Sequence, residues 1–133
     1  MTRIVIDTDV FSFFFKRDTR AQFYAPDLAG AQPCLSFQTV AELQSWAISR
    51  GWGAKRRQQL SDVIRHYLVF PSDEAMVRLW AEVTAHRRAL GHEVACGDAW
   101  IAATALRHGA TLMTHNAKDY ADIPNLTIIS RGP

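Results

Sequence analysis

Short apolar segments alternate with helical segments along almost the whole chain, and this alternation restricts the fold more than any other feature. Buried strands are predicted at residues 3–6, 34–35, 68–70, 111–113 and 126–129, which are short and mostly apolar. Helices are predicted at residues 8–16, 20–28, 37–49, 54–67, 73–90 and 98–108. Ser36 is a candidate N-cap of the helix at 37–49. Strands that alternate with helices form a parallel sheet that is covered on both faces. The sequence therefore predicts an α/β fold with a central, mainly parallel sheet of about five short strands.

The chain has the length of one folded domain. It has 133 residues, of which 48% are apolar, so we expect a single domain over residues 1–133 with a packed core. No segment approaches the roughly 18 apolar residues of a membrane-spanning helix, and the N-terminus lacks the pattern of a signal peptide, so we expect a cytoplasmic protein. Cys34 and Cys96 form no CxxC pattern, and we expect two reduced thiols that pack as small apolar groups.

Acidic residues follow the first predicted strand directly. The apolar run Ile4-Val5-Ile6 ends at Asp7, and Asp9 comes two residues later. In parallel sheets covered by helices, ligands bind beyond the carboxyl ends of the strands. Asp7 lies at such an end, and so does the segment Thr114-His115-Asn116 after the fourth predicted strand. We therefore expect a binding site at this edge of the sheet.

Five carboxylates lie near predicted strand ends or helix starts: Asp7, Asp9, Glu42, Asp98 and Asp119. Singly, each has an ordinary explanation, because Asp7 and Asp98 can cap the helices that follow them and the others can face solvent or a loop. Together, however, the carboxylates would repel one another and raise one another's pKa values. A divalent cation such as Mg²⁺ or Mn²⁺ removes this repulsion and prefers oxygen ligands. Zinc is disfavoured because the chain has neither a CxxC motif nor a His pair at ligand spacing.

The charge outside these acids is positive. The chain has 15 Lys and Arg against 13 Asp and Glu, so without the five candidate acids the remainder carries an excess of about seven positive charges. An acidic pit in a basic surface suits a polyanion such as RNA. The densest basic residues form two groups, which are Arg50, Lys55, Arg56 and Arg57 beside Trp46 and Trp52, and Lys16, Arg17 and Arg20 near the end of the first helix. We regard these groups as candidate RNA contacts, although solvated helix faces have the same pattern, and the tryptophans can stack on bases or pack in a core or interface.

Four motifs occur in a fixed order: IDTDVFSF from residue 6, TVAEL from residue 39, GDAWIAATAL from residue 97 and LMTHNAKDY from residue 112. In this order and at these spacings, the chain resembles the PIN-domain ribonucleases, and among them the small VapC-type toxins of bacterial toxin–antitoxin pairs. The resemblance covers roughly residues 3–130. It implies a PIN-like fold of three layers, α/β/α.

The resemblance also implies which residues act in catalysis and metal binding. Asp7, Glu42 and Asp98 match the three core acids of the family. Asn116 and Asp119 share its fourth position, because some relatives carry an acid at the first of these positions and many carry Asn there with Asp at the second.

Three further residues of the motifs support the site or depart from the family. Thr114 matches a small hydroxyl residue of the family. Asp9 is a departure, because most relatives carry Asn or Ser there, and its carboxylate can add a metal ligand or bond to the backbone of the turn. Gly97 is a second departure, because many relatives carry a polar residue before the aspartate.

The activity implied by the resemblance is a metal-dependent endoribonuclease. In the family, the acids hold Mg²⁺ or Mn²⁺, a water attacks an RNA phosphodiester in line, and the products carry a 5′-phosphate and a 3′-hydroxyl. Relatives often cut tRNA or rRNA, are usually homodimers, and are inhibited by a cognate antitoxin whose C-terminal segment enters the acidic groove. We therefore expect an RNA substrate, an antitoxin partner and a homodimer.

Three alternatives remain at this point. A haloacid-dehalogenase-type phosphatase would use Asp7 as nucleophile and Asp9 as acid–base, but Ala102 stands where its second late aspartate is expected. A receiver-like phosphoacceptor domain needs an aspartate directly after its third strand, where Pro71 and Ser72 stand. A PIN-like protein that only binds partners would carry the same acids as a nuclease.

Overall fold

A five-stranded sheet in the order β3-β2-β1-β4-β5 forms the centre of the structure, a computed structural model that describes residues 1–133. The strands are β1 (Arg3–Ile6), β2 (Gln32–Ser36), β3 (Leu68–Phe70), β4 (Thr111–Met113) and β5 (Ile128–Ile129). Every neighbouring pair is parallel, and Val5 of the central strand pairs with Cys34 on one side and Leu112 on the other. The predicted parallel sheet of five short strands is confirmed.

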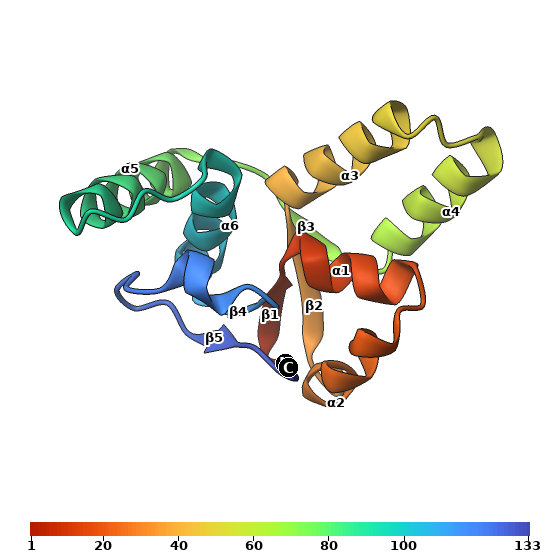
Figure 1. Cartoon of the computed structure of the whole chain (residues 1–133), viewed down its shortest axis with the longest axis horizontal. Coiled ribbons are helices and arrows are strands. Elements are labelled where there is room, and N and C mark those ends of the chain that lie inside the picture. The colour runs from red at the N-terminus through yellow and green to blue at the C-terminus, as the bar shows by residue number, and fades with distance from the viewer.

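Helices cover both faces of this sheet (Figure 1). They are α1 (Thr8–Phe15), α2 (Ala25–Leu28), α3 (Phe37–Ser49), α4 (Ala54–Ile64), α5 (Glu74–Ala89) and α6 (Cys96–Arg107), with short 3-10 turns at Thr19–Phe23 and Ala117–Tyr120. In Figure 1, α3 and α4 extend to one side of the sheet and α5 and α6 to the other. The expected three-layer α/β/α arrangement is therefore present.

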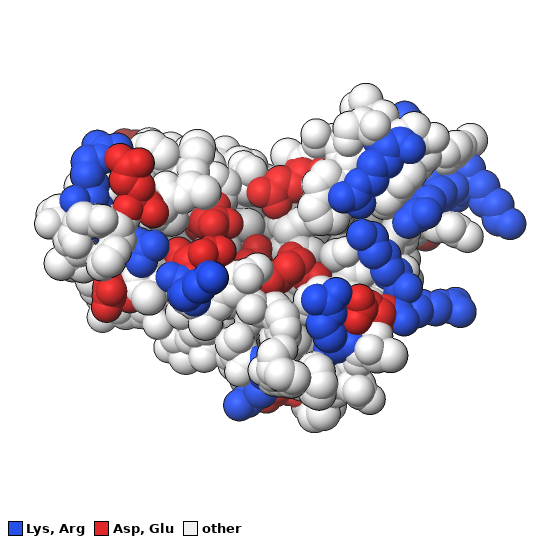
Figure 2. Space-filling model, in the orientation of Figure 1, with Lys and Arg blue, Asp and Glu red and all other residues white.

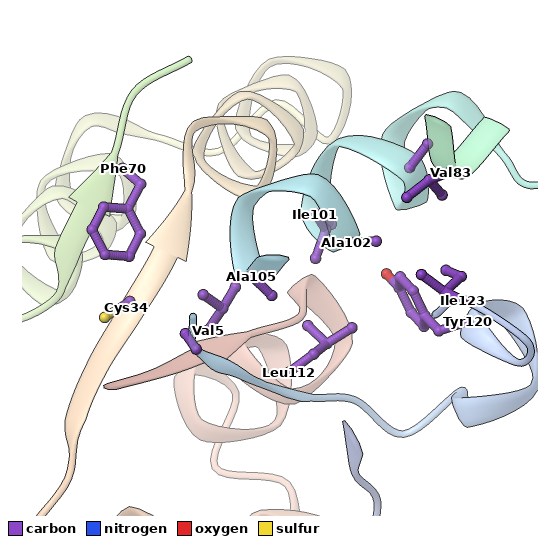
Figure 3. Packing of buried hydrophobic residues seen from close by; sticks show 12 residues of the cluster. Val5, Cys34, Phe70, Val83, Ile101, Ala102, Ala105, Leu112, Tyr120 and Ile123 are labelled. Carbon is purple, nitrogen blue, oxygen red and sulfur yellow. The ribbon is translucent and has the colours of Figure 1, made fainter. Parts of the chain in front are cut away.

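Alternate residues of the central strand point to opposite faces of the sheet, as the two-residue period of a strand requires. Val5 packs with apolar residues of α5 and α6 (Figure 3), whereas Ile4 and Ile6 pack with residues of α1, α3 and α4. All three side chains are buried, with exposed fractions of 3% or less. Burial of each such side chain stabilises the fold by roughly 1.5–3 kcal/mol.

The helix α6 lies close to the sheet because its inner face is made mostly of small side chains. Ala99, Ala102 and Ala105 are fully buried in the same cluster as Val5. Figure 3 shows α6 lying over β1 and β4, with Ala102 and Ala105 on its inner side together with the larger Ile101. This close packing fixes the position of the first turn of α6, which carries Asp98.

Two predicted caps are confirmed, and both place a helix start at the carboxyl edge of the sheet. The Asp7 carboxylate accepts a hydrogen bond from the Thr8 N–H at 2.8 Å, directly after β1. The Ser36 hydroxyl accepts one from the Gln38 N–H at 3.2 Å, directly after β2. As a result, α1 and α3 begin beside each other at the edge where a ligand was expected.

Some predicted boundaries differ from the structure. The helix predicted at 20–28 is two short pieces, which meet at Tyr24 because Pro26 lacks an N–H and can be accommodated only in the first turn of α2. The helix predicted to reach residue 67 ends at Ile64, and the last strand begins at residue 128 instead of 126. None of the helices combines the length and apolar character needed to cross a membrane.

Two predictions about single residues are wrong. Asp98 is not an N-cap, because α6 begins at Cys96 and places this carboxylate inside its first turn, where the positive end of the helix dipole favours an acid. Cys96 is exposed, so it does not pack as a small apolar group, whereas Cys34 is buried as expected. Both thiols are free.

Candidate active site

An open pocket of about 300 Å³ lies at the carboxyl edge of the sheet. Its lining residues come from the end of β1, the start of α1, α3, the start of α6 and the loop after β4; they are Asp7, Thr8, Asp9, Glu42, Trp46, Asp98, Asn116 and Asp119. The structure therefore brings together all the acids singled out in the sequence, together with Asn116. Figure 2 shows carboxylates gathered in the hollow between the α3–α4 side and the α5–α6 side.

Asp7 is the most deeply placed of these acids, with an exposed fraction of 6%. One carboxylate oxygen accepts the Thr8 N–H, and the other accepts the hydroxyls of Thr114 at 2.7 Å and Tyr120 at 3.0 Å. Burial, followed by the nearby charge of Asp9, raises the pKa of Asp7 to about 6. Three donors thus orient a carboxylate whose negative charge is still incompletely compensated.

Tyr120 joins the two acids nearest the centre of the pocket. Its hydroxyl lies 3.0 Å from Asp7 Oδ2 and 3.2 Å from Asp98 Oδ1, and its ring is buried in the core beneath α6 (Figure 3). Burial, followed by the charge of Asp7, raises the pKa of Asp98 to about 6. Burial and the two carboxylates also raise the pKa of the Tyr120 hydroxyl far above its ordinary value, so it stays a hydrogen-bond donor.

Glu42 is held at the α3 side of the pocket by polar neighbours. The Thr8 hydroxyl donates to one of its oxygens, and the Gln38 side-chain amide donates to the other at 3.3 Å. A Cβ atom at Gly97 would come within 2.9 Å of both the Gln38 amide and the Glu42 carboxylate. Glycine at this position therefore leaves the Gln38 and Glu42 side chains in place, whereas a Cβ atom would push their ends aside.

Asp9 binds the backbone and side chain of the loop after β4. One of its oxygens accepts the Val10 N–H at 2.7 Å, and the other accepts the His115 N–H at 3.1 Å and the Asn116 side-chain amide at 2.9 Å. Burial raises its pKa despite these donors. Of the two roles considered for Asp9, the structure shows the bond to the loop, and its role as an additional metal ligand stays a prediction.

The loop that carries Asn116 and Asp119 is fixed from two directions. The Asn116 N–H donates to the Thr114 hydroxyl at 3.0 Å, so the same hydroxyl supports both this loop and Asp7. From the other side, the buried Arg87 of α5 donates to the backbone carbonyls of Asp119 and Ala121. The carboxylate of Asp119 is thus presented on a supported turn.

Comparison with known proteins identifies the family. The family model of the PIN domain matches residues 4–126. The chain belongs to the PIN-domain family. It is similar to ribonuclease VapC4 of Mycobacterium tuberculosis (strain ATCC 25618 / H37Rv), with 30% identity over 131 residues and 96% of each chain covered. It is also similar to toxin FitB of Neisseria gonorrhoeae (strain ATCC 700825 / FA 1090), with 25% identity over 126 residues, 88% of this chain and 90% of FitB.

Solved structures share the fold of this PIN domain. The structure of VapBC2 from Rickettsia felis bound to a DNA fragment from its promoter matches with a TM-score of 0.87 at 19% identity, covering 98% of this chain and 100% of the other. VapBC-1 from nontypeable Haemophilus influenzae matches with a TM-score of 0.85 at 22% identity, covering 97% and 98%. At these identities the likeness establishes the fold.

The donor set of this PIN domain fits a hard divalent cation. Every candidate ligand is an oxygen donor, and the pKa values of Asp7 and Asp98 are raised to about 6, first by burial and then by the charge of a neighbouring carboxylate, which is Asp9 for Asp7 and Asp7 for Asp98. No three His, Cys, Asp or Glu side chains form a ready-made ligand group. That arrangement fits a cation which takes one or two carboxylates directly and reaches the others through water, as Mg²⁺ does.

Two contributors to the site were missed in the sequence, because Thr8 positions Glu42 and Tyr120 links Asp7 to Asp98. Trp46, considered from the sequence for stacking on bases or packing, lines the pocket. Tyr120 closes the motif LMTHNAKDY, so its position was visible, but an aromatic residue there predicts core packing alone. Its hydroxyl contact depends on the register of β1 and β4, which no local pattern reveals.

Proposed function

We propose that this protein is a metal-dependent endoribonuclease that acts in the cytoplasm as the toxin of a toxin–antitoxin pair, and that residues 1–133 form a single PIN domain. The observation that carries the proposal is the pocket in which Asp7, Glu42 and Asp98 converge with the Asn116–Asp119 loop at the carboxyl edge of the sheet. Support comes from family membership and from the likeness over nearly the whole chain to ribonuclease VapC4.

The cation would be Mg²⁺ or Mn²⁺, held by Asp7 and Asp98, with Glu42 and Asp119 as further ligands or water-mediated contacts. Asp9 is an additional candidate ligand. When bound, such a cation activates water and neutralises charge that develops on the phosphoryl oxygens. Burial, followed by repulsion from a neighbouring carboxylate, raises the pKa values of Asp7 and Asp98. This supports the assignment, because a bound cation would compensate the negative charge that both effects disfavour.

The side chains of the pocket then have separate tasks. Tyr120 and Thr114 hold the Asp7 carboxylate in one orientation through their hydroxyls. Thr8 holds Glu42 in the same way from the start of α1. Asp98 uses one oxygen to accept the Tyr120 hydroxyl, and its other oxygen is available to bind the cation.

The partners are proposed from the relatives. Several solved relatives are toxin–antitoxin assemblies, among them the complex from Klebsiella pneumoniae and VapBC-5 from Mycobacterium tuberculosis. We extend this to a cognate antitoxin for the present chain, to a homodimer, and to tRNA or rRNA as the substrate.

The first experiment is cleavage of total cellular RNA by purified protein in the presence of Mg²⁺, Mn²⁺ or EDTA. The Asp98→Asn variant should lose cleavage by several orders of magnitude, because it loses a charged ligand from the centre of the pocket. Asp122→Asn is the matched control, since this exposed aspartate lies outside the pocket. Discrete fragments that require metal and disappear in Asp98→Asn support the proposal.

The remaining alternatives give different results in the same assay. A PIN-like module that only binds partners would leave RNA intact under every condition. Cleavage by Asp98→Asn at the wild-type rate would contradict the site assignment. The phosphatase alternative has no support from the family match, and Asp9, its acid–base, already accepts two N–H groups from the loop after β4.

A further inference from the structure

The two basic groups of the sequence meet in space at a second pocket. This α1–α4 pocket has a volume of about 620 Å³, lies between the end of α1 and the outer face of α4, and is lined by Lys16, Arg17 and Arg56 over an apolar wall that includes Phe15 and Val63. No Asp or Glu lines it. Residues about 40 positions apart in the chain therefore place three cations around one hollow.

These three cations have no acidic partner. The protein forms four ion pairs, and none of them includes Lys16, Arg17 or Arg56. Arg20, from the same sequence group, differs because Asp18 binds it at 2.8 Å. The α1–α4 pocket therefore has an uncompensated positive potential, as Figure 2 shows by the basic side chains gathered over this side of the molecule.

Aromatic rings hold the cations of this region in place. The Arg56 guanidinium lies 4.1 Å from the centre of the Trp52 ring, and the Arg50 guanidinium lies 4.7 Å from that of Trp46. A guanidinium held over a ring loses little further freedom on binding, and the contact with the ring face does not use its N–H donors. Such donors match the oxygens of a phosphate.

Trp46 connects the α1–α4 pocket to the acidic pocket. Its ring lines the acidic pocket, and the Lys16 ammonium lies 5.7 Å from its centre. On α3, Trp46 follows Glu42 by four residues, which is about one helical turn. A strand whose cleaved bond lies beside Glu42 would therefore pass over Trp46 before it reaches the α1–α4 pocket.

The backbone at Arg17 gives an independent indication. Arg17 follows the C-cap of α1, Lys16, and has φ 55°, in the left-handed region that favours glycine. The Asp18 N–H donates to the Phe13 carbonyl at 2.8 Å, as in a Schellman motif at a helix C-terminus. Glycine or asparagine would fit this position with less strain. The arginine at this position therefore costs conformational free energy that a glycine would not, which is consistent with a functional use of its side chain.

We propose that the α1–α4 pocket is a subsite for backbone phosphates of the RNA strand that enters the acidic pocket. Lys16, Arg17 and Arg56 bind the phosphates, and Trp46 forms the surface between the two pockets. This inference rests on the proposed ribonuclease function and adds to it a second contact away from the cleaved bond. Because the contacts are to phosphates, we expect the subsite to bind RNA without base specificity.

The test measures RNA binding without cleavage. Protein carrying Asp98→Asn, in EDTA, is titrated with a single-stranded oligoribonucleotide of mixed sequence over a series of salt concentrations. The plot of the logarithm of the association constant against the logarithm of salt concentration has a negative slope. Adding Arg17→Gly and Arg56→Gln should make this slope less steep by about 1.4 and weaken binding more than tenfold at about 0.1 M salt. Arg17→Gly alone should weaken binding while its melting temperature stays equal or rises, which separates the effect from unfolding.

The matched control is Arg88→Gln, which removes one positive charge from an exposed position on α5, on the other side of the sheet. It should leave the affinity and the salt slope nearly unchanged. If the double change at Arg17 and Arg56 has no larger effect than this control, the pocket is not a phosphate subsite. The same conclusion follows if the double change leaves RNA affinity intact but weakens binding of a protein partner.

Failure of the subsite can be distinguished from failure of the proposed function. Metal-dependent cleavage by the otherwise unchanged protein, lost in Asp98→Asn, tests the function alone. If that cleavage is present and the RNA affinity does not change when Arg17 and Arg56 are replaced, only the subsite proposal is wrong. If the unchanged protein neither cleaves nor binds RNA, both proposals are wrong.

Discussion

At the scale of single residues, the site depends on carboxylates whose negative charge is not fully balanced by hydrogen-bond donors or cations of the protein itself. Asp7 and Asp98 share one phenol proton, from Tyr120, and both lie at the edge of the buried core. One hydroxyl proton cannot form a full hydrogen bond to both carboxylates at once. The folded state therefore holds two negative charges close together at a cost in free energy. This cost in stability is typical of functional sites, where charged groups are held in positions that stability alone disfavours.

This cost predicts that Asp98→Asn stabilises the metal-free protein while it removes activity. The folded state raises the pKa of Asp98 to about 6 from 3.8, so wild-type protein loses stability as pH rises from about 4 to 6, and the Asn variant lacks this loss. After allowance for solvent screening of this half-exposed group, we expect a gain of about 1 kcal/mol at pH 7, or about 4 °C in Tm.

The measurement is thermal unfolding in EDTA across this pH range. The difference between the variant and wild type should grow from pH 4 to pH 6 and then stay constant, because above the folded pKa both states carry the ionised group. A variant that melts below wild type at pH 7 would show that Asp98 stabilises the metal-free fold, contrary to the argument.

At the scale of elements, the starts of α1, α3 and α6 meet at one edge of the sheet, and the sequence revealed only part of this. Asp7 and Ser36 were predicted as caps because a cap depends on residues next to it in the chain. The start of α6 was placed two residues late, since neither Ala95 nor Cys96 carries a start signal. The close approach of α6 to α3 is a tertiary contact, and Gly97 gives no local sign of it.

Gly97→Ala tests this contact between helices. The added Cβ would lie 2.9 Å from the ends of the Gln38 and Glu42 side chains, which are flexible and can move. Alanine in a helix is favoured over glycine by roughly 0.5–1 kcal/mol, so the melting temperature should stay equal or rise slightly. Cleavage should fall at least tenfold, because Glu42 leaves the position that the Thr8 hydroxyl defines.

Ala95→Gly is a suitable comparison for Gly97→Ala, because it changes the same turn of chain without adding an atom beside Glu42. It should change the melting temperature little, because Ala95 is the N-cap of α6 and glycine is accepted there at least as well as alanine, and it should leave the cleavage rate nearly intact. Equal activity of Gly97→Ala and wild type would mean that Glu42 tolerates displacement, and its assignment among the acting acids would need revision.

At the scale of the whole molecule, the charges are separated in a way that composition hides. A net charge of +2 describes neither the acidic pocket nor the basic α1–α4 pocket beside it. The sequence showed both kinds of residue and their approximate numbers. It could not show that Lys16 and Arg56 lie at one hollow, because that depends on how α1 and α4 pack on the same face of the sheet.

The acidic pocket predicts that divalent cations stabilise the whole fold. A ligand that binds only the folded state raises stability by about 2.7 kcal/mol at 100 times its Kd, which for this chain length is about 10 °C in Tm. We expect Tm to rise with the logarithm of Mg²⁺ concentration in the wild-type protein, and less steeply in Asp98→Asn. Because any salt screens the repulsion between carboxylates, each sample needs a NaCl control of equal ionic strength. If Mg²⁺ and NaCl raise Tm equally, the carboxylates respond to screening alone, and the pocket does not bind the cation that the proposed activity requires.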